Sequence, residues 1–127
     1  MKINSILIER YLSMVTESRA AMLDDPAGDL TAYDDAIDAM GVAARAADDD
    51  DLLRMSIDAL IASPGGGRLA QFAGSAYRWP NREFVPLLTH ACERLWPDTA
   101  LSEAGDAAEI EFLPMSSEEW AAYSGRV

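Results

Sequence analysis

The chain has 127 residues, with 22 acidic against 10 basic side chains and a formal net charge of −12 at pH 7. A field this negative repels nucleic acid and anionic lipid and attracts cations, so we expect no nucleic-acid partner and no membrane partner. The length suits one domain, and abundant alanine with few β-branched residues favours helices. We predict a single acidic domain over 1–127 of the all-α class: a compact, mostly antiparallel bundle of five or six helices with an irregular C-terminal segment.

The first residues do not have the pattern of a secretory signal. The apolar run Ile6–Ile8 is followed at once by Glu9, whereas a signal peptide needs a longer apolar core. No apolar run approaches the ~20 residues that span a bilayer. Cys92 is the only cysteine, so no internal disulfide can form. We therefore expect a cytoplasmic protein.

Two helices are predicted in the first part of the chain. The first runs from Asn4 to Leu23, is capped by Asn4 or Ser5, and has a wide apolar arc that suits a central helix. Its inward residues are Ile3, Leu7, Ile8, Tyr11, Leu12, Met14, Val15 and Met22. The second runs from Thr31 to Ala47 with Thr31 as its cap. Its inward stripe is Tyr33, Ile37, Met40, Ala44 and Ala47.

Three further helices are predicted in the middle of the chain. One runs from Asp50 to Ala62, buries Leu53, Ile57 and Leu60, and ends at the turn 63–67. The next runs from Arg68 to Trp79. The last reaches Trp96 and begins either after an Asn81 cap or only at Val85 or Pro86, because a proline is tolerated only in a first helical turn.

The C-terminal part gives weaker signals. Residues 98–109 are small and polar and indicate a loop or a short helical turn. Glu109–Leu113 alternates polar and apolar residues, which indicates a short strand. Ser116 and Glu119 form a capping box, so a last short helix is predicted from Ser117 to Tyr123.

The acidic residues are concentrated in residues 24–58, which hold eleven acids and two bases, a local charge of −9. We predict that part of this segment forms a surface that binds a basic partner. The residues assigned to it are Asp34, Asp35, Asp38, Asp48, Asp49, Asp50, Asp51 and Asp58.

The string Asp34–Asp38 is similar to the aspartate-rich DDxxD motif of isoprenoid synthases, which binds magnesium diphosphate. The similarity covers five residues. Those enzymes need a helical barrel more than twice this length, and no second acidic motif paired with a lysine is present. We therefore expect a solvated helix face and assign no metal ligand and no cofactor. A divalent-metal site at Asp34, Asp35 and Asp38 is the alternative.

Two other segments are weighed as ion-binding sites, Asp48–Asp51 for calcium and 63–68 for an anion, and are set aside in that role. Asp48–Asp51 lacks the spacing and the central glycine of an EF-hand loop, so helix capping is expected there. The glycines in 63–68 lack the lysine pattern and the preceding strand of a phosphate-binding loop, so a connector is expected.

His90 and Cys92 invite interpretation as a catalytic pair. Two residues apart on a helix, they point about 200° from each other and cannot pair within it. We expect an exposed histidine and a buried structural cysteine.

The segment from Arg68 to Arg94 is locally basic, with four arginines and two acids. Tyr, Arg and Trp often anchor interfaces, so this segment is a candidate for a secondary interface. Its residues are Tyr77, Arg78, Trp79 and Arg82. The simpler interpretation is that Trp79 packs into the core. If this basic patch meets the acidic surface of a second copy, a homo-oligomer results.

The leading hypothesis is a binding protein rather than an enzyme. It would dock on a basic protein and neutralise it, as an immunity protein or antitoxin does with a cationic toxin. One alternative is a small helical enzyme or ligand-binding domain that uses a carboxylate-bound divalent metal. Another is an adaptor or structural subunit whose acidity keeps it soluble.

Overall fold

The computed structural model describes residues 2–18, 25, 28–62, 69–74, 77–98 and 110–124. These residues form five α-helices with two short strands and two 3-10 turns, which confirms the all-α prediction. In chain order the elements are β1 (Lys2–Asn4), α1 (Ser5–Thr16), η2 (Leu30–Tyr33), α2 (Asp34–Ala46), α3 (Asp50–Ala62), η3 (Ala70–Phe72), α4 (Asn81–Leu95), β2 (Glu111–Leu113) and α6 (Ser117–Ser124).

Helix α1 lies at the centre and touches α2, α3, η3 and β2. The Asn4 side chain caps it, as predicted, by accepting a hydrogen bond from the Ile6 amide. The predicted end at Leu23 is wrong, because the helix stops at Thr16 and the Glu17 amide closes its last turn. Met22 lies outside the described residues, and Met14 is exposed rather than inward.

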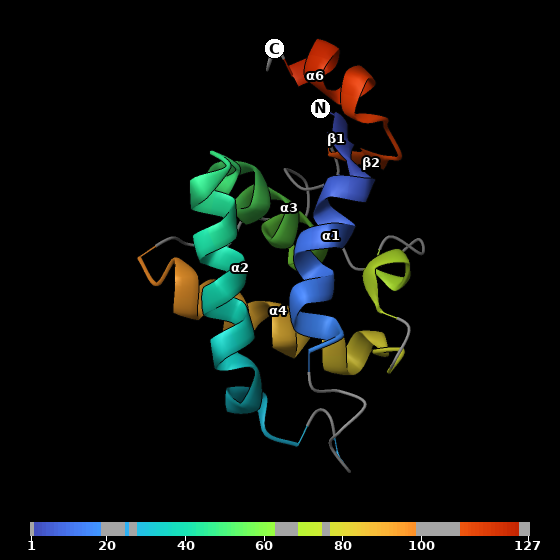
Figure 1. The fold of residues 1–127 in the computed structure, drawn as a ribbon. Coiled ribbons are helices and arrows are strands. Elements are labelled where there is room, and N and C mark those ends of the chain that lie inside the picture. Colours follow the sequence, from blue (N-terminus) through green and yellow to red (C-terminus); the bar gives the residue numbers. More distant parts are fainter. Residues whose placement is uncertain are drawn as a thin grey trace.

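Helix α2 runs antiparallel to α1 beside it, while α4 crosses behind both in the view of Figure 1. The predicted Thr31 cap is wrong. Asp29 accepts hydrogen bonds from the Thr31 amide and hydroxyl, at 3.1 and 2.6 Å, and starts the η2 turn that leads into α2. The four inward residues from Tyr33 to Ala44 are fully buried, but Ala47 lies beyond the helix and is exposed.

A left-handed residue joins α2 to α3. Asp48 has φ +59°, and its amide donates to the Arg45 carbonyl at 3.2 Å while the Asp49 amide donates to Ala44 at 2.7 Å. This pair of bonds is a Schellman motif, which usually places glycine where Asp48 stands. Helix α3 then begins at Asp50 and ends at Ala62, as predicted, with its three predicted inward residues fully buried.

The helix predicted from Arg68 to Trp79 is wrong. Among the described residues of this segment, 69–74 and 77–79, only the short turn η3 is helical, and Gly74, at φ +84°, follows it. Leu69 and Phe72 are nevertheless buried, because one 3-10 turn is enough to point them inward. The predicted connector 63–68 lies outside the described residues.

Helix α4 starts at Asn81, so Asn81 is its first helical residue rather than its cap, and Pro80 precedes it. Pro86 therefore lies inside the helix, not in its first turn, and is exposed. Opposite it, Phe84, Leu88 and Ala91 are buried as predicted.

The two ends of the described chain meet. Strand β1 pairs in parallel with β2, with Ile3 opposite Phe112. The strand expected near Glu109–Leu113 is thus present as β2, whereas β1 was not predicted. The Ser116–Glu119 capping box forms as expected, with the Glu119 amide 3.1 Å from Ser116 Oγ, and α6 follows it beside β1 (Figure 1).

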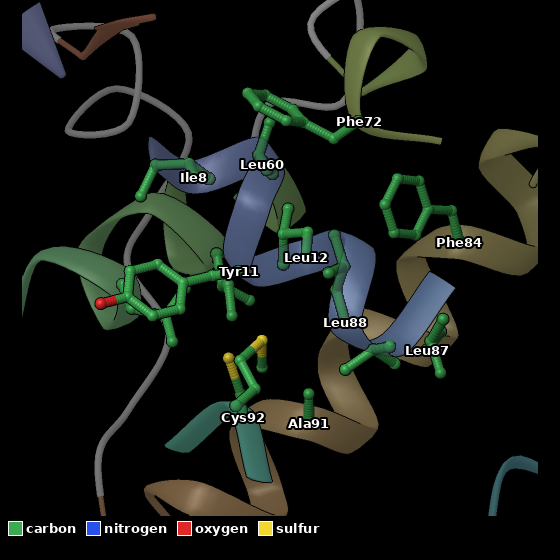
Figure 2. Packing of buried hydrophobic residues seen from close by; sticks show 14 of the residues in the cluster. Ile8, Tyr11, Leu12, Leu60, Phe72, Phe84, Leu87, Leu88, Ala91 and Cys92 are labelled. Carbon is green, nitrogen blue, oxygen red and sulfur yellow. The ribbon is translucent and has the colours of Figure 1, made fainter. Parts of the chain in front are cut away.

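The hydrophobic core draws on all the larger helices. Figure 2 shows Ile8 and Leu12 of α1 among Leu60 of α3, Phe72 of η3 and Leu88 of α4. Each such side chain contributes roughly 1.5–3 kcal/mol on burial. No helix within the described part of the chain is both long and apolar enough to cross a bilayer.

Candidate protein-binding surface

Seven of the eight aspartates of the predicted acidic surface fall into two groups at opposite ends of α2, and Asp58 lies apart from both within α3. Asp34, Asp35 and Asp38 lie in its first turns, and Asp48–Asp51 lies at the corner between α2 and α3 (Figure 1). A helix of this length is about 20 Å long. The eight aspartates therefore do not form one tight cluster.

The first group is partly neutralised by α4. Arg94 binds Asp38 with two hydrogen bonds of 2.8 Å and lies 3.4 Å from Asp34. His90 Nε2 lies 2.7 Å from Asp34 Oδ1. The Arg94 hydrogen bond holds the pKa of the Asp38 carboxyl below its ordinary value of 3.8. The carboxylates of Asp34 and Asp38 therefore bind residues of α4 within the protein itself. The Asp35 side chain is exposed.

Asp49 in the second group is an internal structural residue. It is 4% exposed, and its carboxylate accepts a 2.6 Å hydrogen bond from the Tyr11 hydroxyl of α1. Its carbonyl accepts the Leu53 amide in the first turn of α3. A carboxylate held in this way is not available to a partner.

Asp50 and Asp58 are also engaged within the fold. Asp50 accepts the Trp96 indole N–H at 3.2 Å and lies 3.7 Å from Arg45. Asp58 is 9% exposed in α3, and its charge acts on Cys92. The binding role of all eight residues stays a prediction, and the surface open to a large partner is narrower than the sequence indicated.

Three exposed aspartates of the predicted surface form no ion pair with Arg94, although the charge of Asp35 acts on that arginine. They are Asp35, Asp48 and Asp51, called the exposed aspartates below. Asp48 and Asp51 lie together at the α2–α3 corner. Asp48 is presented there by its left-handed backbone, a conformation that aspartate adopts more readily than most residues.

The predicted secondary interface also contains both buried and exposed residues. Trp79 is 2% exposed and packs edge-on against Tyr33 and Tyr77, with ring centroids 5.5 and 5.1 Å apart. The expectation that Trp79 belongs to the core is met. Tyr77 is half-buried and its hydroxyl donates to Glu83. Arg78 and Arg82 are exposed and are the part of this patch that a second molecule can reach.

His90 and Cys92 do not form a catalytic pair. His90 is half-buried against Asp34 rather than fully exposed as expected. Cys92 is buried on the other face of α4, where desolvation and the Asp58 charge raise the thiol pKa to about 12. A thiol protonated at neutral pH is a poor nucleophile.

The metal-site alternative gains no support from the geometry. In the described ranges no three His, Cys, Asp or Glu side chains come together as a metal site would require. Asp34 and Asp38 instead bind the cationic Arg94.

A hollow that the sequence did not indicate lies between α1 and η3. It has a volume of about 360 Å³, and its lining includes Glu9 and Ser13 of α1 and Glu17, the residue that caps the end of α1. These three residues are spaced four apart, so they share one face of the helix. This row of polar residues could have indicated the hollow, but the prediction for α1 relied on the apolar arc beside it.

Comparison of the chain with family models, with curated proteins and with solved structures gives no match.

Proposed function

We propose that the protein is an acidic binding module that docks on a basic protein and neutralises it, in the manner of an immunity protein or antitoxin acting on a cationic toxin. The observation that carries the proposal is a large negative charge with carboxylates on the surface. The net charge is −12, and Asp35, Asp48 and Asp51 are exposed to solvent.

The proposed contact region is the α2–α3 corner. Asp48 and Asp51 present two carboxylates there, and the buried Asp49 between them anchors the corner to Tyr11 of α1. A fixed corner loses little conformational freedom on binding. The negative field around it would speed the approach of a basic partner and make association sensitive to salt.

The other two hypotheses have less support. A metal-dependent enzyme would need Asp34 and Asp38 as ligands, and both are engaged by Arg94. An adaptor would use an aromatic contact through Trp79 or Trp120 instead, and Trp79 is buried while Trp120 is half-buried. The partner's identity and the cytoplasmic location remain predictions.

A pull-down from the source lysate over a salt series tests the proposal. The wild type is compared with Asp35→Asn/Asp48→Asn/Asp51→Asn and with a control, Glu111→Gln/Glu118→Gln/Glu119→Gln, which removes the same charge from β2 and α6. Glutamine keeps the α6 capping box. We expect a basic protein that is retained at low salt by the wild type and the control, released at high salt, and lost by the aspartate variant. Retention of the basic protein that does not change with salt contradicts the proposal. Equal retention by the aspartate variant and the control contradicts it as well.

A further inference from the structure

A second hollow lies between the start of α1 and the last helix, α6. Its volume of about 270 Å³ is just below the range of small-molecule sites, roughly 300–1,000 Å³, so it suits a small ligand. Its wall comes from both ends of the described chain, which lie side by side at β1 and α6 (Figure 1). None of the aspartates assigned to the docking surface belongs to this wall.

The wall of this hollow is largely apolar and carries one positive charge. Ile6, Leu7 and Arg10 share one face of α1, because they are three or four residues apart, and Trp120 lines the hollow from α6. Arg10 is exposed and forms no ion pair with any residue that the structure describes. The described lining contains no acid, although the chain has 22. The hollow therefore favours an anion with an apolar part.

Asn4 adds an unused hydrogen-bond donor to the same wall. It is 5% exposed, and its Oδ1 accepts bonds from the Ile6 amide at 3.2 Å and the Met115 amide at 3.1 Å. Its Nδ2 donates to no acceptor in the described part of the chain. Nδ2 is not sealed from solvent, because Thr16 Oγ1 is the single fully buried side-chain polar atom without a partner among the described residues. Since Asn4 lines the hollow, a ligand there can accept from Nδ2.

The start of α1 also lacks the acids that neutralise other helix starts. Helices α2, α3, α4 and α6 each have at least one acid in the first turn, whereas α1 has none. The positive end of the α1 dipole is therefore not compensated within the helix, and it adds to the attraction that Arg10 and Asn4 offer an anion.

We infer that the hollow between α1 and α6 binds a small aromatic carboxylate. The Arg10 guanidinium and the Asn4 Nδ2 amide hold the carboxylate near the start of α1. Helical side chains lean toward the N-terminus of their helix, so Arg10 can extend toward Asn4. The ring of the ligand lies against the half-buried Trp120 indole and the apolar side chains of Ile6 and Leu7.

The test is a titration of the whole chain with three probes, followed by amide chemical shifts and calorimetry. Phenylacetate has the ring and the charge, phenylacetamide has nearly the same shape without the charge, and acetate has the charge without the ring. We expect saturable binding of phenylacetate with shifts at residues 4–10 and 115–121, and binding at least tenfold weaker for the other two probes. Non-saturating shifts with phenylacetate, shifts confined to other residues, or equal binding of either control probe would overturn the inference.

Two variants and a control locate the site. Asn4→Asp keeps an oxygen that caps α1 and accepts both amides, but it replaces the Nδ2 donor with an oxygen that repels a carboxylate. The variant should therefore stay folded while phenylacetate binding falls at least tenfold. The exposed Arg10→Gln should weaken binding by a similar factor, whereas Arg82→Gln, which removes the same charge from α4, should bind like the wild type.

Unchanged affinity in either Asn4→Asp or Arg10→Gln, or an equal loss in Arg82→Gln, would refute the inference. The result does not depend on the proposed docking function, because Asp35, Asp48 and Asp51 do not line this hollow. A failed pull-down and a failed phenylacetate titration are therefore separate outcomes.

Discussion

Asp48 combines an unfavourable backbone conformation with an exposed charge. Its φ of +59° occupies the left-handed region, where glycine is the usual residue at this position of a Schellman motif. A glycine would fit the turn with less strain, yet it would remove a carboxylate from the α2–α3 corner.

The backbone cost at Asp48 is measurable by comparing two truncations. Both Asp48→Gly and Asp48→Ala remove the side-chain contacts, so their difference reports the backbone alone. We expect Asp48→Gly to be more stable than Asp48→Ala by about 1 kcal/mol, because alanine keeps the Cβ that the left-handed conformation opposes. Urea denaturation gives both free energies of unfolding. Equal values would mean that Asp48 is not left-handed in solution.

Tyr11 matters because its hydroxyl serves a buried carboxylate. Tyr11→Phe leaves the Asp49 carboxylate with one donor fewer inside the fold, so we expect a loss of about 1–3 kcal/mol in the free energy of unfolding. Tyr123→Phe is the matched control, since the Tyr123 hydroxyl accepts an exposed hydrogen bond from the Lys2 amide, and the loss of an exposed bond should stay within about 0.5 kcal/mol. Equal effects of the two substitutions in urea titrations would show that the Tyr11–Asp49 bond adds nothing.

At the scale of elements, the pairing of α2 with α4 depends on charge as well as on packing. Arg94 and His90 on α4 face Asp34 and Asp38 on α2. Gly41 lets Leu95 lie close to α2, because a Cβ at Gly41 would be 2.6 Å from Leu95 Cδ2. Both features hold the two helices together near the first group of aspartates.

The α2–α4 ion pair predicts a particular pH dependence. Because Arg94 lowers the folded-state pKa of Asp38, the pair stabilises the fold above the unfolded pKa, which is near 3.8, and this contribution is lost as pH falls through the lower folded pKa. Arg94→Gln should therefore be less stable than wild type at neutral pH, and the difference should shrink in acid. Thermal unfolding from pH 7 down to about pH 2.5 measures it.

The control for that experiment is Arg82→Gln, an exposed arginine on the same helix. It should show no acid-dependent change in its difference from wild type. A stability difference for Arg94→Gln that is constant over the whole pH range would contradict the assigned ion pair.

Pro86 should destabilise α4. It lies inside a helix that begins at Asn81, so it removes a backbone donor and crowds the carbonyl four residues before it. Since Pro86 is exposed, Pro86→Ala should raise the free energy of unfolding by about 1–3 kcal/mol. An unchanged melting temperature would instead fit a helix that begins at Val85 or Pro86.

The sequence predicted elements best where both ends carried a signal. The bounds of α3 agree because an aspartate pair starts it and the glycine-rich sequence 63–67 follows it. The segment from Arg68 to Trp79 misled the prediction because Leu69 and Phe72 have helical spacing, although Gly74 breaks the helix after one turn. Local spacing cannot tell a 3-10 turn from the first turn of an α-helix.

The candidate site was less predictable than the fold, because its pairings join residues distant in sequence. Tyr11 and Asp49 are 38 positions apart, and Asp38 and Arg94 are 56 apart. Identical aspartates next to one another therefore have different roles, with Asp49 buried and Asp48 and Asp51 exposed. Composition gives the total charge, but only the fold determines which carboxylates are exposed.

At the scale of the whole molecule, ten basic residues cannot balance 22 acids, so a strong negative field persists around the folded chain. This field is the central element of the proposed function. It acts at a distance, whereas the exposed aspartates act on contact. Both effects weaken with added salt, because mobile ions screen exposed charges beyond about 10 Å at 0.1 M ionic strength.

The most direct measurement is the association rate constant with the captured basic partner as a function of ionic strength, for the wild type and for Asp35→Asn/Asp48→Asn/Asp51→Asn. We predict a wild-type rate constant that falls by about tenfold or more between low and physiological salt, and a slower, flatter dependence for the variant. A wild-type rate constant that does not change with salt, or a variant that follows the wild-type curve, would contradict the account.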